Sequence, residues 1–176
     1  MATILFNGIL DVHYGQVYVL PKAAHGFAME DGFRGQENGL CGAALQECLF
    51  LITGLHIGGV QFRVELHDHV PFELDDWADI VEVPFSVSGP VNLEQWAGEA
   101  VYPLQIPKVQ YRARYAANDM DAGSEVDTAI IGPDSYLLQF WPVGTQTPDA
   151  VIRQTSKCAE YWHQAWKRQD RQTNGY

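Results

Sequence analysis

Strict alternation of apolar and polar residues limits the folds open to this chain more than any other feature. Every second residue is apolar in two stretches, 60–66 and 79–87. A period of two predicts β-strands with one face on a core and the other facing water or a partner. The apolar sets are Phe62, Val64 and Leu66 in the first stretch and Val81, Val83, Phe85 and Val87 in the second.

Further short strands are expected along most of the chain, separated by glycine, proline and polar residues. A chain of 176 residues is long enough to bury one core. Many short strands with frequent turns predict one mainly β domain, an antiparallel β-sandwich, over residues 1–176. The expected strands are two within 3–20, divided at Asn7-Gly8, and others at 48–53, 102–106, 109–116 and 136–141.

The C-terminal part changes character. From Pro148 onward apolar residues recur every three or four positions, which predicts one amphipathic helix over about 149–170. We expect this C-terminal α-helix to pack Tyr161, Trp162 and Trp166 on the sandwich. Residues 21–39 and 117–128 are expected to be loops.

The acidic charge lies in the middle of the sequence. The formal net charge is −11, and residues 65–134 carry all of it, with fourteen acidic and three basic side chains. Binding to nucleic acid is disfavoured because phosphate contacts need clustered Lys and Arg. A basic protein partner is favoured because complementary charge speeds association. Acidity for solubility alone explains the same composition.

The cysteines and the N-terminal residues show no pattern typical of a disulfide-rich, zinc-binding or secreted protein. Three cysteines without a CxxC pair predict free thiols rather than a disulfide framework or structural zinc. The first ten residues read as a strand rather than a signal peptide, and no apolar run is long enough to span a membrane. We therefore expect a cytoplasmic protein that needs no cofactor and does not bind membranes.

One acidic segment is the candidate partner-binding surface. Between the strands 60–66 and 79–87, carboxylates surround an aromatic residue, which is typical of a contact surface rather than a catalytic centre. Carboxylates on one protein can occupy the cationic cleft of another. The candidate partner-binding residues are Glu73, Asp75, Asp76, Trp77, Asp79, Glu82, Asp119 and Asp121.

Other residues permit other chemistry. His67 and His69 share a face of a strand and could reach one metal ion, yet no third ligand is evident. Cys41 lies among small residues whose backbone N–H groups could stabilise an oxyanion. The common catalytic motifs are absent, so the chain is not expected to be an enzyme. A small-ligand or carbohydrate-binding platform could use Tyr14, Tyr18, Trp96, Tyr111, Tyr115 or Trp141, with 21–39 as its lid.

The strand pattern resembles the competence-J type of nuclease inhibitor, a small acidic bacterial β-sandwich that blocks a DNA-entry nuclease. The residues that carry the resemblance are Val12–Val19, Glu82–Val87, Leu104–Tyr111 and the strand at 136–141. The loop 21–39 and the helix after Pro148 depart from the family's pattern. The resemblance implies an intracellular inhibitor or immunity protein that neutralises a bacterial toxin, plausibly a nuclease, by stoichiometric binding.

Overall fold

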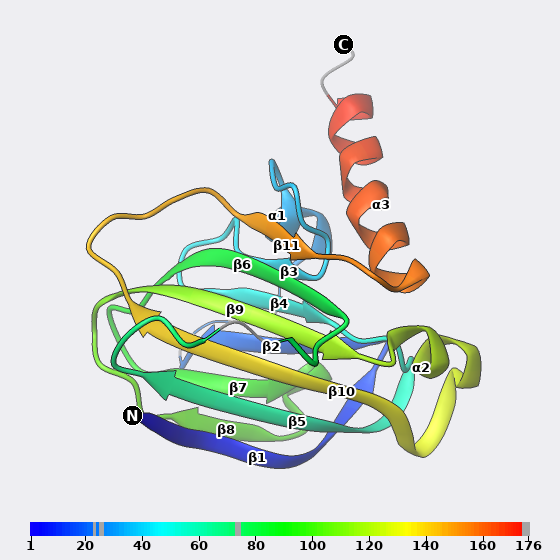
Figure 1. Cartoon of the computed structure of the whole chain (residues 1–176), viewed down its shortest axis with the longest axis horizontal. Coiled ribbons are helices and arrows are strands. Elements are labelled where there is room, and N and C mark those ends of the chain that lie inside the picture. Colours follow the sequence, from blue (N-terminus) through cyan, green and yellow to red (C-terminus); the bar gives the residue numbers. More distant parts are fainter. Residues whose placement is uncertain (23, 25–26, 73–74, 174–176) are drawn as a thin grey trace.

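The computed structural model describes residues 1–22, 24, 27–72 and 75–173, with side chains up to residue 167. Eleven strands in this part of the chain form one hydrogen-bonded sheet (Figure 1). The strands are β1 (Ala2–His13), β2 (Gln16–Pro21), β3 (Cys41–Gly42), β4 (Leu49–Ile52), β5 (Ile57–His67), β6 (Asp79–Ser86), β7 (Val91–Gln95), β8 (Val101–Leu104), β9 (Gln110–Asn118), β10 (Thr128–Pro142) and β11 (Ala150–Arg153). The helices are α1 (Met29–Phe33), α2 (Met120–Val126) and α3 (Lys157–Thr173), with a 3-10 turn at Trp96–Gly98.

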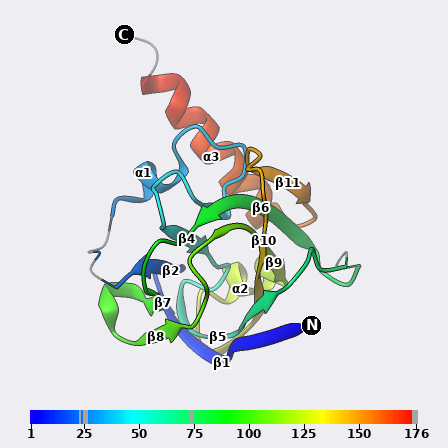
Figure 2. The same cartoon turned by 90° about the vertical axis from the view of Figure 1, so that its left-hand side faces the viewer.

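The sheet curls into a half-barrel rather than forming a clear sandwich (Figure 2). One arm runs in the order β11-β6-β9-β10-β5-β1. It joins the other arm at the β1–β2 turn, through the single pair His13 and Gln16. In the second arm β2 lies between β4 and β7, with β3 and β8 at the edges. The prediction of a mainly β chain with a C-terminal helix is confirmed, while the two-sheet arrangement is replaced by one continuous sheet.

The sheet is not purely antiparallel, and the reason is the position of β9 and β10. These two strands pair with each other and lie between β5 and β6. As a result β10 runs parallel to β5, with Tyr136 opposite Phe62. Strands β5 and β6 are consecutive in the sequence but are not neighbours, so the acidic segment between them must cross two strands.

The alternating strands bury the expected face. Val81, Val83 and Phe85 of β6 lie in the core, together with Phe62 and Val64 of β5. Several tyrosines join them because the curled sheet encloses enough space for large rings, whose stacking adds to the burial of apolar area. One such group is Phe62, Tyr115 and Tyr136, with ring centroids 5.6–6.3 Å apart.

The predicted helix over 149–170 is wrong at its start. Ala150–Arg153 instead forms β11, which pairs with the edge of β6, and the helix begins at Lys157. Ser156 ends the extended segment because its Oγ accepts the Ala159 N–H at 3.0 Å, as an N-cap residue does. Side chains of α3 contact α1, where Trp166 stacks on Phe33 with ring centroids 4.9 Å apart. Tyr161, expected in this contact, is 61% exposed.

Two smaller predictions also need correction. Strand β1 continues through Asn7-Gly8, and the chain reverses at Tyr14-Gly15, where both residues have positive φ. The expected loop 117–128 contains α2, and the expected loop 21–39 contains α1. No helix in the described part of the chain is both long and apolar enough to cross a membrane.

Candidate functional site

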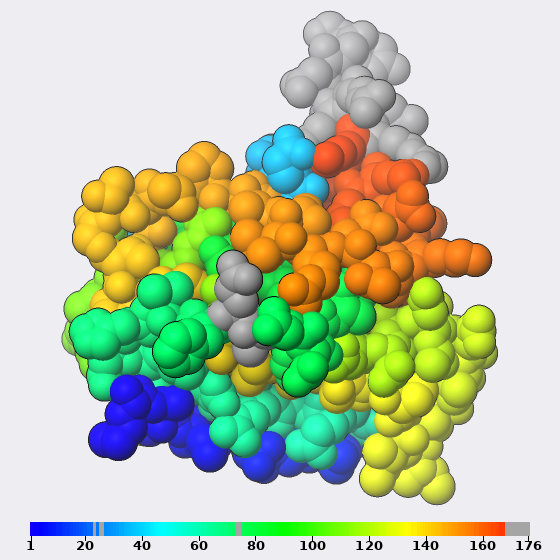
Figure 3. All heavy atoms as spheres, viewed as in Figure 1, coloured from blue at the N-terminus to red at the C-terminus, as the bar shows by residue number. Residues whose placement is uncertain are grey.

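The described parts of the segment between β5 and β6, residues 68–72 and 75–78, lie on the outer face of the sheet (Figure 3). Hydrogen bonds hold their main chain there. Arg114 of β9 donates to the Phe72 carbonyl at 3.0 Å, and Arg153 donates to the Trp77 carbonyl at 2.7 Å. The Asn118 side chain forms two hydrogen bonds to this main chain: it accepts the Ala78 N–H at 2.8 Å and donates to the Asp76 carbonyl at 3.1 Å. The sheet therefore fixes this segment by its main chain.

The carboxylates of Asp75 and Asp76 remain available at the surface. Both residues are exposed, and neither side chain forms an ion pair within the described part of the chain. Asp119 is also exposed, at the start of α2 and next to Asn118, so it belongs to the same surface. We call Asp75, Asp76 and Asp119 the acidic ridge. Glu73, the remaining predicted member of this segment, lies outside the described residues.

Trp77 attaches the segment to the sheet. Its ring is partly buried against Ile80, Ala116 and Leu137, which form a small apolar cluster on the outer face. The contacts of the Trp77 ring that the structure shows are made within the protein, and its role as a partner anchor stays a prediction.

Asp79 and Asp121 serve the fold by capping α3. Asp79 is fully buried, and its Oδ1 accepts the N–H groups of Thr155 at 2.7 Å and Ser156 at 3.0 Å. Asp121 accepts the next two, from Lys157 at 3.1 Å and Cys158 at 2.8 Å. Carboxylates at a helix N-terminus satisfy N–H groups that have no partner inside the helix. Asp79 is thus closed to a partner, contrary to the prediction.

Glu82 is likewise held within the protein. Its carboxylate lies between Arg112 Nε at 3.3 Å and Arg114 Nε at 2.9 Å. Arg114 also lies over the Trp141 ring, 5.1 Å from its centroid. Because all three charged side chains are largely covered, Glu82 stabilises the outer face instead of facing a partner.

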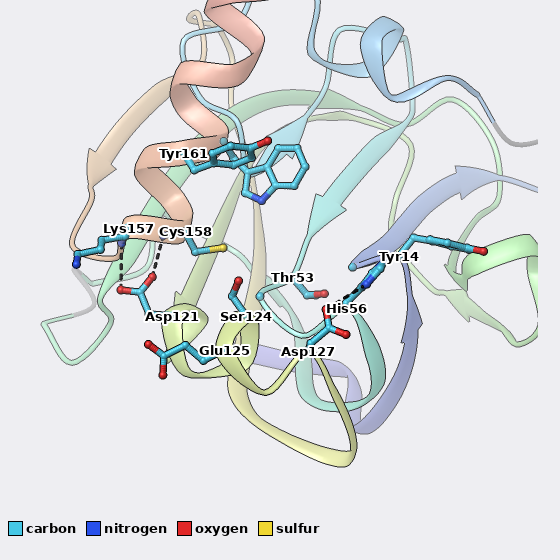
Figure 4. A pocket seen from close by; sticks show the side chains of 13 residues that line it. Tyr14, Thr53, His56, Asp121, Ser124, Glu125, Asp127, Lys157, Cys158 and Tyr161 are labelled. Carbon is cyan, nitrogen blue, oxygen red and sulfur yellow. Dashed lines mark hydrogen bonds and ion pairs between the residues drawn. The ribbon is translucent and has the colours of Figure 1, made fainter.

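A pocket of about 540 Å³ opens beside the acidic ridge, at the end of the molecule where α2, α3 and the β1–β2 turn meet (Figure 4). We call it the end pocket. Asp121 and Glu125 lie on one side and Asp127 with His56 on the other, with Ser124, Thr53 and Cys158 between them. The Asp127 carboxylate is 3.3 Å from His56 Nδ1. Sequence reasoning missed this pocket because its residues come from segments far apart in the chain.

The cysteines of the chain are poor nucleophiles. Burial, followed by the charges of the nearby carboxylates of Asp121, Asp79 and Asp134, raises the pKa of the Cys158 thiol to about 11. Complete burial, followed by the charge of Asp149, raises the pKa of Cys41 as well. Nucleophilic catalysis needs the thiolate, so protonated thiols at neutral pH argue against it.

The histidine pair does not assemble a metal site in the described residues. His67 Nε2 lies 2.8 Å from the Glu65 carboxylate, and His69 is exposed in the following turn. No group of three or more potential ligands of a metal ion occurs in the part of the chain that the structure describes.

The aromatic platform of the small-ligand alternative is not assembled. Tyr18, Tyr111 and Tyr115 lie in the core, and Trp141 is covered by Arg114. Of the six predicted rings, Tyr14 is the exposed one and Trp96 is half-buried, with their centroids 5.2 Å apart.

Comparisons with known proteins bear on the fold. No protein-family model and no curated protein sequence matches the chain. The crystal structure of ComJ, inhibitor of the DNA degrading activity of NucA, from Bacillus subtilis, superposes with a TM-score of 0.57 at 15% identity. The match covers 81% of this chain and 99% of ComJ.

A second solved structure, that of crocagin biosynthetic gene J, matches with a TM-score of 0.51 at 16% identity. It covers 81% of this chain and 98% of the other. Identities this low establish the fold alone, and the fold of this chain is ComJ-like. The family resemblance predicted from the strand pattern is confirmed at that level.

Proposed function

We propose that this chain is a stoichiometric protein inhibitor of a nuclease. The observation that carries the proposal is the acidic ridge, whose carboxylates are exposed and unpaired in the described structure while the backbone beneath Asp75 and Asp76 is fixed to the sheet. The ComJ-like fold supports it, since ComJ inhibits a DNA-degrading enzyme.

The carboxylates of the ridge are suited to bind the part of a nuclease that normally binds DNA phosphates. A nuclease holds its substrate with Lys and Arg side chains, which also bind carboxylates. Because the ridge backbone is already ordered, little conformational entropy is lost when the partner binds. The net charge of −11 adds long-range attraction to a basic protein.

The proposal assigns no turnover to the chain. It acts by occupying the nuclease's cleft, and each inhibitor molecule blocks one enzyme molecule. More specifically, we propose that the chain is an immunity protein that binds a nuclease toxin in the cytoplasm.

Complex formation tests the proposal. We would mix the purified chain with NucA from Bacillus subtilis and, separately, with each nuclease encoded beside this chain in its own genome, and analyse the mixtures by size-exclusion chromatography. We expect one of these nucleases to elute as a complex at low salt and to dissociate at high salt. If none of them forms a complex at any salt concentration, the proposal is wrong.

The ridge itself is tested by the double variant Asp75→Ala/Asp76→Ala. We expect the dissociation constant of the complex to rise at least tenfold and its salt dependence to weaken, because roughly 1–3 kcal/mol of charge pairing is lost. The matched control is Glu30→Ala/Asp31→Ala, which removes the same charge from α1 on the opposite side of the molecule (Figure 2). Equal effects of the two double variants would show that overall charge, and not the ridge, drives binding.

A further inference from the structure

We propose that the end pocket receives an arginine side chain of the partner protein. This inference rests on the proposed function for the identity of the partner, and it adds a second contact next to the acidic ridge. The ridge and the pocket meet at the start of α2, where Asp119 of the ridge lies two residues before Asp121 at the pocket edge.

Aromatic rings form the walls of the pocket. Tyr161 and Trp162 come from α3, with ring centroids 5.1 Å apart, and Tyr14 comes from the β1–β2 turn. Tyr14 and Tyr161 are 56% and 61% exposed, which is high for such large side chains. Rings of this kind bind the flat faces of guanidinium groups.

Tyr14 occupies a strained backbone position in the β1–β2 turn, at the edge of the pocket. Tyr14 and Gly15 have φ of 58° and 61°, as in a two-residue hairpin turn. Glycine or asparagine is the ordinary choice at the first of these positions, because a bulky side chain with positive φ is strained. The Tyr14 ring contacts His56 at 5.5 Å and Trp96 at 5.2 Å and points away from the pocket centre, so Tyr14 contributes to the pocket rim (Figure 4).

The charge of the pocket selects a cation. Three carboxylates, from Asp121, Glu125 and Asp127, line it together with one lysine. The Lys157 side chain extends away from the pocket centre (Figure 4) and makes no ion pair with these carboxylates in the described structure. The Asp121 carboxylate accepts N–H groups at the start of α3, and the Asp127 carboxylate lies next to His56. Glu125 is therefore the lining carboxylate without a partner among the described residues.

Arginine fits these surroundings better than lysine. Its planar group can stack on Tyr161 and still donate several N–H bonds in the plane of the group, to Glu125 and to the Ser124 hydroxyl. A lysine ammonium has no flat face and would keep more of its water. The volume of about 540 Å³ accommodates a guanidinium group and part of its stem.

The test uses short capped peptides, so it does not depend on finding the nuclease. The probe is the tripeptide Gly-Arg-Gly, and its control is Gly-citrulline-Gly, which has nearly the same shape without the charge. We would follow the assigned indole N–H signal of Trp162 by NMR during each titration. We expect saturable shifts with the arginine peptide, with a dissociation constant on the order of millimolar, and none with the citrulline peptide.

Two variants locate the contact. Glu125→Gln is expected to weaken binding of the arginine peptide about three- to tenfold, from the loss of a charge-assisted hydrogen bond. Glu160→Gln, which removes an exposed carboxylate of α3 that does not line the pocket, is expected to leave binding unchanged. Tyr161→Ala is expected to weaken binding while the fold, followed by the remaining tryptophan signals, stays intact.

Absent or equal shifts with the two peptides would overturn the inference, and so would an unchanged affinity in Glu125→Gln. Such a result would leave nuclease binding through the acidic ridge intact. Conversely, arginine-peptide binding without any nuclease complex would refute the proposed function alone.

Discussion

At the scale of single residues, carboxylates that are near one another in sequence have opposite roles. Asp75 and Asp76 face solvent, whereas Asp79, three residues later, is buried and caps α3. The difference follows from the strand: once β6 begins at Asp79, the backbone is paired and its side chains alternate between the two faces.

Replacing these aspartates separates the two roles. Asp79→Ala is expected to lower the free energy of unfolding by roughly 1–3 kcal/mol, because the N–H groups of Thr155 and Ser156 lose their acceptor. Asp75→Ala is expected to change it by less than about 0.5 kcal/mol, as an exposed substitution does. Urea unfolding followed by tryptophan fluorescence measures both. A similar loss in the two variants would contradict the capping role of Asp79.

Residue types alone could not separate these roles. The sequence correctly predicted that the segment around Asp75 and Asp76 is exposed and acidic, but Glu82 was grouped with them. Its position between Arg112 and Arg114 depends on β9 pairing with β6, a long-range contact that no local pattern encodes.

At the scale of elements, α3 is attached to the Gly39 loop by a close main-chain approach and by a hydrogen bond from the loop to a histidine of the helix. Its main chain approaches the Gly39 loop so closely that a side chain at Gly39 would lie 2.2 Å from the Trp162 carbonyl oxygen. There His163 Nδ1 accepts the Gly39 N–H at 2.8 Å, so the imidazole is neutral at that nitrogen. Asp149 holds the same loop by accepting the Asn38 N–H at 2.7 Å.

This attachment makes stability depend on pH. Burial lowers the pKa of His163 from its usual 6.5, and Lys167 lowers it further, although Asp79 and Asp149 act in the opposite direction. As the pH falls below 6.5 the unfolded chain takes up the proton first, so this contribution is complete above 6.5 and is lost as the pH drops through the lowered pKa.

We therefore expect the free energy of unfolding to decrease as the pH falls below 6.5 and through the lowered pKa of His163, by roughly 1–3 kcal/mol, because the Gly39 N–H loses its acceptor. His163→Gln should remove this part of the pH dependence, while His69→Gln, at an exposed position, should retain it. Urea unfolding at several pH values measures it. Parallel pH profiles for wild type and His163→Gln would contradict the assignment.

The start of α3 shows where local patterns fail. Val151 and Thr155 match a helical spacing, yet Ala150–Arg153 extends the sheet because the edge of β6 offers unpaired backbone groups. The helical spacing predicted neither the Ser156 cap nor the tertiary pairing of β11 with β6.

At the scale of the whole molecule, alternation predicted the strands but not their order. The apolar faces of β5 and β6 point inward as expected. Which strands are neighbours depends on how β9 and β10 insert between them, and this insertion places the acidic segment across the outer face. The acidic ridge is therefore a consequence of topology as much as of composition.

The most direct test of the inhibitor role is a titration of nuclease activity. A fixed amount of the nuclease that forms the complex is mixed with increasing amounts of the chain, and DNA degradation is measured. We predict that activity falls linearly and reaches its minimum at one chain per nuclease. Full activity at a large excess of the chain would contradict the account, and so would complete loss at amounts far below equimolar, which would show that the chain acts by turnover.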